Sequence, residues 1–137
     1  HLFKDQDQIS FTEEFRNLAH DLTHPEDFPM KELNIQAELR DYQKKGIQWL
    51  QMLHHYGFGG ILADDMGLGK TLQTIAFLSS QVQADTSVLI LAPSGLIYNW
   101  ADEFQKFAPD LDVAVVHGLK SHRESILAEN HQIYVTS

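Results

Sequence analysis

The segment DDMGLGKT, from Asp64 to Thr71, is the feature of this sequence that most restricts its fold. It lies between an apolar run that ends at Ala63 and a helix-like run that begins at Thr71. A strand, a glycine-rich loop and a helix in this order form a phosphate cradle, because the N–H groups of the loop and the positive end of the helix dipole converge on an anion. The sequence therefore predicts a phosphate-binding loop within an α/β domain.

The residue types in this loop fit the parts of such a site. Gly67 and Gly69 let the backbone approach a ligand closely. Lys70 supplies a cation for the β- and γ-phosphate oxygens, and the Thr71 hydroxyl is placed to bind Mg²⁺. We predict Lys70 and Thr71 as catalytic residues and Thr71 as the metal ligand, and we expect Lys70 to lack a strong protein partner while the loop is empty. The nucleotide-binding residues predicted within the loop are Asp65, Met66, Gly67, Leu68, Gly69, Lys70 and Thr71.

The first position of the loop departs from the G-x-x-x-x-G-K-[ST] pattern, because Asp64 stands where that pattern has glycine. An alternative is a helix N-terminus capped by Asp64 or Asp65, with an ordinary Gly-Leu-Gly turn and a solvated Lys70. The strand pattern before the loop and the helix pattern after it favour nucleotide binding over this alternative.

Composition sets limits on the partners. The 137 residues include 19 acidic and 10 basic side chains, which give a formal net charge of −9. This charge argues against a generally basic nucleic-acid surface, so any DNA contact must come from a local patch or from residues outside the chain. No apolar run approaches the ~20 residues that cross a bilayer, and we expect no membrane partner. The chain begins at His1 and stops after a strand-like run, so we expect it to be part of a longer protein.

The first 36 residues are predicted to form an N-terminal helical extension or linker, and residues 37–137 the main domain. A short helix is expected to open at Ser10, with Glu13 in capping-box spacing. Phe11, Phe15 and Leu18 fall on one face of this helix.

Beyond the extension, hydrophobic patterns alternate between the periods of helices and strands. Helices are expected at about 37–56, 71–83, 96–107 and 120–129, and strands at 59–63, 88–92, 113–116 and 133–136. Gly57 suits the left-handed position after the first of these helices. Alternating strands and helices predict a parallel sheet with helices on both faces, so the expected fold class is α/β.

Four separated blocks of the sequence belong together, namely LRDYQKKGIQWL (39–50), ADDMGLGKTLQTI (63–75), LILAPSGLIYNWADEF (89–104) and IYVTS (133–137). They resemble one family, the Swi/Snf-type ATPases, which are superfamily 2 motors that translocate on duplex DNA. Their residues are most similar to those of bacterial members. The loop alone is common to many NTPases, whereas the blocks in this order are specific. The resemblance implies a partial RecA-like lobe over 37–137, truncated before the acidic motif that binds Mg²⁺. In this family an acidic residue commonly takes the place occupied by Asp64.

The resemblance also implies roles for single residues. Gln43 matches the glutamine that reads adenine, since its amide can donate and accept at once. Four residues are implied to face DNA: Pro93, Ser94, Thr136 and Ser137. The implied cofactors are ATP and Mg²⁺, and the implied partners are duplex DNA, bound weakly by this piece, and a second RecA-like lobe.

The implied function is ATP binding within an ATP-dependent DNA translocase, an enzyme that couples ATP hydrolysis to movement on duplex DNA. Hydrolysis also needs an acidic pair and an arginine finger. No later strand ends in an Asp-Glu pair, so the isolated chain is expected to be inactive. The expected location is the bacterial cytoplasm at the nucleoid, or the nucleus if the protein is eukaryotic. Two alternatives stay open at this point: a P-loop small-molecule kinase or other nucleotide-binding protein, and a non-catalytic DNA- or protein-interaction module.

Overall fold

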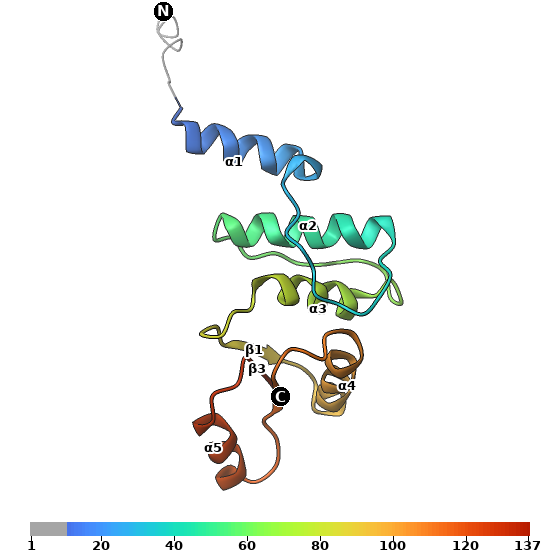
Figure 1. The fold of residues 1–137 in the computed structure, drawn as a ribbon, viewed down its shortest axis with the longest axis vertical. Coiled ribbons are helices and arrows are strands. Elements are labelled where there is room, and N and C mark those ends of the chain that lie inside the picture. Colours follow the sequence, from blue (N-terminus) through green and yellow to red (C-terminus); the bar gives the residue numbers. More distant parts are fainter. Residues whose placement is uncertain (1–10) are drawn as a thin grey trace, which may run out of the picture.

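A computed structural model describes residues 11–137 of the chain as stacked helices on one side of a small parallel sheet, with further helices flanking its strands (Figure 1). The helices are α1 (Glu13–Thr23), α2 (Asp41–His55), α3 (Lys70–Gln81), α4 (Ile97–Phe107) and α5 (Lys120–Ala128), with short 3-10 turns η1 (Pro25–Asp27) and η2 (Ser94–Leu96). The strands are β1 (Val88–Leu91), β2 (Val113–Val115) and β3 (Ile133–Thr136). None of the helices described between residues 11 and 137 is long and apolar enough to span a bilayer.

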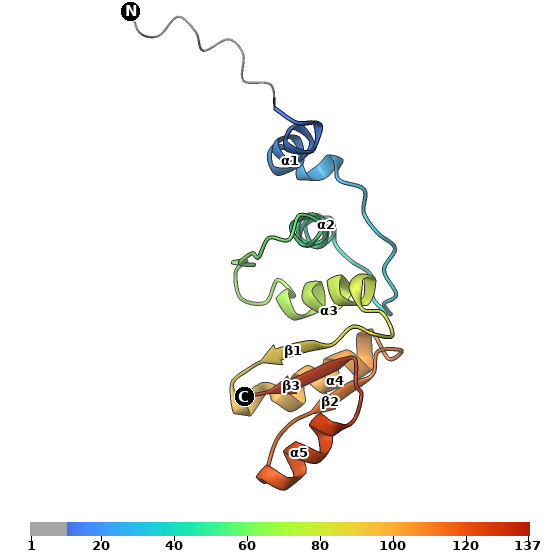
Figure 2. The ribbon, with the colours of Figure 1, turned by 90° about the vertical axis from the view of Figure 1, so that its left-hand side faces the viewer.

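The three strands are parallel and lie in the order β1-β3-β2 (Figure 2). The chain passes from β1 over β3 to β2 through α4 and then returns to β3 through α5. Because parallel crossovers are right-handed, two crossovers in opposite directions place their helices on opposite faces of the sheet. Figure 1 shows α4 and α5 on opposite sides of the strands. The predicted α/β class, with a parallel sheet between helices, is confirmed.

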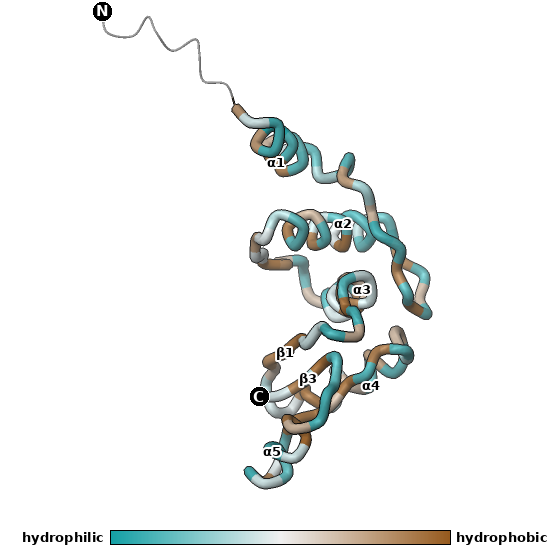
Figure 3. Tube along the Cα trace, turned by 60° about the vertical axis from the view of Figure 1, so that its left-hand side comes forward, coloured by the Kyte–Doolittle hydropathy of each residue, from teal (hydrophilic) through white to brown (hydrophobic). Residues whose placement is uncertain are grey.

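The main core lies between the sheet and the helices α3 and α4. Its buried members are Ile75, Leu78, Ala92, Ile97, Phe104, Ala108, Ile133 and Val135. The most hydrophobic stretches of the chain lie in β1 and β3 (Figure 3). The opposite face of β1 is open, because Leu89 and Leu91 are 61% and 71% exposed.

The strand predicted at 59–63 is absent, and this prediction is wrong. The segment runs from the end of α2 to the loop without ladder pairing, and Ile61 is 85% exposed. A strand persists only when a neighbour satisfies its backbone N–H and C=O groups, and glycines such as Gly59 and Gly60 weaken it further. Among the described strands, β1 pairs only with β3, so none lies beside this segment.

Helix α2 begins at Asp41 instead of about residue 37. The Arg40 N–H donates to Oε1 of Gln43 at 3.0 Å, and this contact caps the helix at Arg40. At the other end Gly57 has φ +72°, which confirms the predicted left-handed position after the helix.

The N-terminal helix also starts later than predicted. Thr12 is its N-cap, since Oγ1 of Thr12 accepts the Phe15 N–H at 3.3 Å, while Ser10 lies outside the described residues. Helix α1 buries none of its residues. The Tyr56 hydroxyl holds it to α2 by donating to the Asp21 carboxylate at 2.6 Å.

Candidate nucleotide-binding site

The loop before α3 has the backbone that its glycines predict. Gly67 and Gly69 adopt φ of +84° and +76°, a region that disfavours residues with a Cβ. Gly69 is the N-cap of α3, and a Cβ added there would lie 2.6 Å from Nε2 of Gln43. The loop therefore turns tightly into the helix N-terminus, which places backbone N–H groups and the helix dipole at one point.

The Lys70 ammonium folds back onto the loop. Its Nζ donates to the carbonyl oxygens of Asp64 and Asp65 at 2.6 and 2.9 Å. The expectation that Lys70 lacks a strong partner is wrong, because backbone carbonyls of the loop itself serve as acceptors. A phosphate at this point would exchange two neutral acceptors for a charged one, which forms the stronger hydrogen bond.

The Leu68 carbonyl is the point at which two helices hold the loop. It accepts from the Tyr42 hydroxyl at 3.2 Å and from Nε2 of Gln43 at 3.2 Å, both on α2. A third donor, Nε2 of Gln73 on α3, lies 3.4 Å away. Neither Tyr42 nor Gln73 is among the predicted site residues. The sequence does carry one signal for Gln73, because it is a polar residue on the apolar side of its helix.

Gln43 is only 6% exposed, and both ends of its amide are engaged. Oε1 accepts from the Arg40 N–H and Nε2 donates to the Leu68 carbonyl. One N–H hydrogen and one lone pair of the amide are left for a ligand. The structure thus places Gln43 against the loop, and its role in reading a base stays a prediction.

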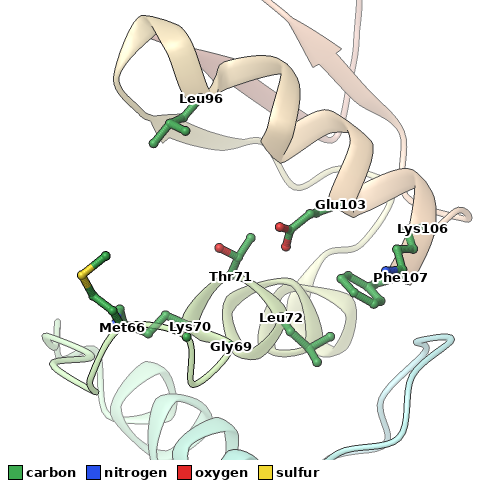
Figure 4. Close-up of a pocket in the computed structure, with 10 residues that line it drawn as sticks. Met66, Gly69, Lys70, Thr71, Leu72, Leu96, Glu103, Lys106 and Phe107 are labelled. Carbon is green, nitrogen blue, oxygen red and sulfur yellow. The ribbon is translucent and has the colours of Figure 1, made fainter.

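A cavity of about 640 Å³ opens between the loop and α4 (Figure 4). Residues of the loop and α3 line one side, namely Met66, Gly67, Gly69, Lys70, Thr71 and Leu72. The other side is lined by Leu96, Glu103, Lys106 and Phe107. Of the predicted nucleotide-binding residues, Gln43, Asp65 and Leu68 do not line this cavity.

Glu103 reaches from α4 across the cavity toward Thr71 (Figure 4). The Asn99 side chain donates to its carboxylate at 3.4 Å. Thr71 and Glu103 together offer a hydroxyl and a carboxylate, which are the oxygen donors that a hard cation such as Mg²⁺ accepts. Glu103 and Lys106 are not among the predicted site residues, because acidic and basic residues three apart on a helix usually indicate a solvated face.

The four residues implied to face DNA lie together at the carboxyl edge of the sheet. Leu91 pairs with Thr136, and the Ala92 N–H donates to the Thr136 carbonyl at 2.9 Å. Pro93 and Ser94 therefore emerge beside Thr136 and Ser137. The Thr136 hydroxyl already donates to the Val116 carbonyl at 2.8 Å. Contact with DNA remains a prediction for all four.

A separate polar cluster lies at the amino end of β3. The two ring nitrogens of His131 lie 2.8 Å from the Glu129 carboxylate and 2.9 Å from the Asp112 carboxylate. These two hydrogen bonds, that to Glu129 first, raise the pKa of His131 above its usual value of 6.5. The cluster is at the opposite edge of the sheet from Ser94 and Ser137, so it joins β2 to β3 and is not part of the loop site.

Comparison with known proteins identifies the family to which this site belongs. The SNF2-related domain matches residues 42–137. YwqA of Bacillus subtilis, whose name describes an ATP-dependent helicase/translocase, is 39% identical over 138 residues, which cover 95% of this chain and 15% of YwqA. The ISWI chromatin-remodeling complex ATPase ISW2 of Saccharomyces cerevisiae is 47% identical over 94 residues, covering 66% of this chain and 8% of ISW2. The chain thus spans a small part of the length of these relatives.

A solved structure agrees with the sequence comparison. The Sulfolobus solfataricus SWI2/SNF2 ATPase core in complex with dsDNA matches with a TM-score of 0.67 and 43% identity, over 78% of this chain and 23% of that one. The family match covers more than half of the chain and includes the P-loop, α3, α4 and all three strands. The resemblance inferred from the four sequence blocks is confirmed: the chain belongs to the SNF2-related domain family.

Proposed function

We propose that this chain provides the ATP-binding part of a DNA-translocating ATPase, in which ATP hydrolysis drives movement on duplex DNA. The observation that carries the proposal is the P-loop itself. Its two left-handed glycines lead directly into α3, and Lys70 and Thr71 line the cavity of about 640 Å³. Family membership favours a motor over the small-molecule kinase alternative.

Each residue of the site would bind a different part of the nucleotide. Lys70 would leave the carbonyls of Asp64 and Asp65 for the β- and γ-phosphate oxygens, and the loop N–H groups would hold the β-phosphate. Gln43, already against the loop, would use its remaining hydrogen and lone pair on the adenine edge. Thr71 would hold Mg²⁺, which neutralises phosphate charge when bound.

Duplex DNA would lie along the carboxyl edge of the sheet. The relative from Sulfolobus solfataricus was solved with dsDNA, and in this chain Ser94 and Ser137 are exposed at that edge. Few such contacts on a chain of net charge −9 give weak, salt-sensitive binding that does not depend on base sequence.

Hydrolysis would require further groups from the whole protein. Phosphoryl transfer in this class uses an acidic pair on a neighbouring strand and an arginine finger from a partner lobe. In the described part of the chain, the carboxyl ends of β1 and β3 lead into Pro93 and Ser137, not into acidic residues. We infer that a second RecA-like lobe and the acidic pair complete the site. The whole protein would act on DNA in the bacterial cytoplasm, or in the nucleus if it is eukaryotic.

The test is ATP hydrolysis by the whole protein that contains this chain, measured with and without duplex DNA. We expect DNA to raise the rate and Lys70→Ala to reduce it to the level without enzyme. Lys31→Ala is the matched control, since Lys31 is exposed and its ammonium donates to the Gln81 side chain at 3.1 Å, away from the cavity. A Lys70→Ala protein with the DNA-stimulated rate of the wild type would refute the proposal.

A further inference from the structure

We propose that Gln73 is a positioning residue that holds the phosphate loop in shape from within the fold. Gln73 lies on α3 one turn after the loop and is 0% exposed. It does not line the cavity, so any effect on a nucleotide passes through the loop. The loop-holding role stands on geometry alone, and only its consequence for nucleotide affinity rests on the proposed function.

The amide of Gln73 ties the two ends of the loop together. Nε2 donates to Oδ2 of Asp64 at 3.0 Å and lies 3.4 Å from the Leu68 carbonyl. Both partners are acceptors, so only the NH₂ end of the amide can face them. Asp64 opens the loop and Leu68 precedes Gly69, the N-cap of α3. One side chain therefore fixes the distance between the start and the end of the loop.

The other end of the amide shows that this orientation is imposed by the loop. Among the buried side-chain oxygen and nitrogen atoms of residues 11–137, Oε1 of Gln73 is the one that has no hydrogen-bond partner. It points at Gly46 of α2, where an added Cβ would collide with it. A buried acceptor without a donor destabilises a fold. Oε1 of Gln73 stays without a donor because the NH₂ end of the same amide faces the loop.

The same contacts explain why Gln73 is not replaceable by the other donors. Tyr42 and Gln43 also bond the Leu68 carbonyl, but both come from α2 and neither reaches Asp64. Among the side chains of residues 11–137, that of Gln73 is the one that donates to the Asp64 carboxylate. Without it the loop remains fastened at Leu68 and loses the hold on the Asp64 carboxylate, while the Asp64 carbonyl keeps only the Lys70 ammonium.

The experiment compares the chain with its Gln73→Met variant, in which an apolar side chain of similar length replaces both amide ends. Backbone ¹⁵N relaxation by NMR gives the order parameters of Asp65 to Gly69. We expect about 0.85 in the wild type, as in rigid backbone, and a fall toward about 0.6 in the variant. Order parameters in α2 and β1 stay unchanged.

Gln51→Met is the matched control. Gln51 is 1% exposed and sits on α2, where its amide bonds Ser80 and the backbone of Lys31 instead of the loop. We expect this variant to unfold at lower urea while the loop keeps its order. Unchanged loop order in Gln73→Met, or an equal loss of order in Gln51→Met, would overturn the proposal.

A second arm measures the dissociation constant of MgADP by titration of the same variants. We expect Gln73→Met to bind about tenfold more weakly than the wild type, with Gln51→Met equal to the wild type. If the wild type binds no nucleotide, the proposed function fails for this chain while the relaxation arm still decides the role of Gln73. Equal affinity of Gln73→Met and wild type would show that loop position does not matter for binding and would overturn the inferred consequence.

Discussion

For Gly46→Ala, helix propensity and tertiary packing predict changes of opposite sign in the free energy of unfolding. Gly46 lies inside α2, so alanine should stabilise the helix by about 1 kcal/mol. The new Cβ would collide with Oε1 of Gln73, whose side chain is fully buried. Moving that amide breaks its hydrogen bond to the charged Asp64 side chain, a loss of about 1.5–3 kcal/mol. The net expectation is a loss of about 0.5–2 kcal/mol.

Urea unfolding followed by tryptophan fluorescence measures this loss, since Trp49 and Trp100 are both partly buried against the two core clusters. The double variant Gly46→Ala with Gln73→Ala removes the collision. In the Gln73→Ala background we expect alanine at residue 46 to stabilise the chain by about 1 kcal/mol, the value set by helix propensity. Gly59→Ala is the control, because no atom lies within 4 Å of a Cβ there and its effect should be near zero. A Gly46→Ala protein as stable as the wild type would refute the close approach of α2 and α3.

Three further predictions concern other contacts. Lys70→Ala should lower the unfolding free energy of the unliganded chain by about 1 kcal/mol in urea titrations, because its two carbonyl contacts are lost; an unchanged midpoint would contradict them. The carboxylates of Glu129 and Asp112 raise the pKa of His131 above 6.5 in the folded chain, so its stabilisation is complete below pH 6.5 and is lost as the pH rises through the higher folded value. The urea midpoint should fall over that range in the wild type and stay flat in His131→Gln. Tyr56→Phe should speed hydrogen exchange of α1 while leaving α3 protected, since the Tyr56 hydroxyl ties α1 to the end of α2 through Asp21. Equal protection of α1 in the variant and the wild type would contradict this.

Elements that depend on local sequence were predictable. The strand at 133–136 was predicted with its observed ends, because β-branched and aromatic residues such as Ile, Tyr, Val and Thr favour strands. The left-handed glycines followed from the loop motif, since the conformation belongs to the residue type. The family and the α/β class followed from the order of such local signals.

Features that depend on neighbours distant in sequence were not predictable. The run at 59–63 has a strand composition, yet a strand also needs a partner, and composition does not show one. Lys70 bonds backbone carbonyls, which every residue carries, so residue types do not reveal that contact. Gln73 matters because Gly46 lets α2 approach α3, and that approach appears only once the helices are packed.

The measurement that tests the central claim most directly is an NMR titration of the chain with MgATP. If the P-loop binds the nucleotide, the backbone amides of Gly67, Gly69, Lys70 and Thr71 should shift first and saturate together, because their N–H groups surround the phosphates. MgGTP should shift the same amides but bind more weakly, since Gln43 would lose the adenine edge. Shifts confined to other parts of the chain, or none at millimolar MgATP, would contradict the assignment of this loop as the nucleotide site.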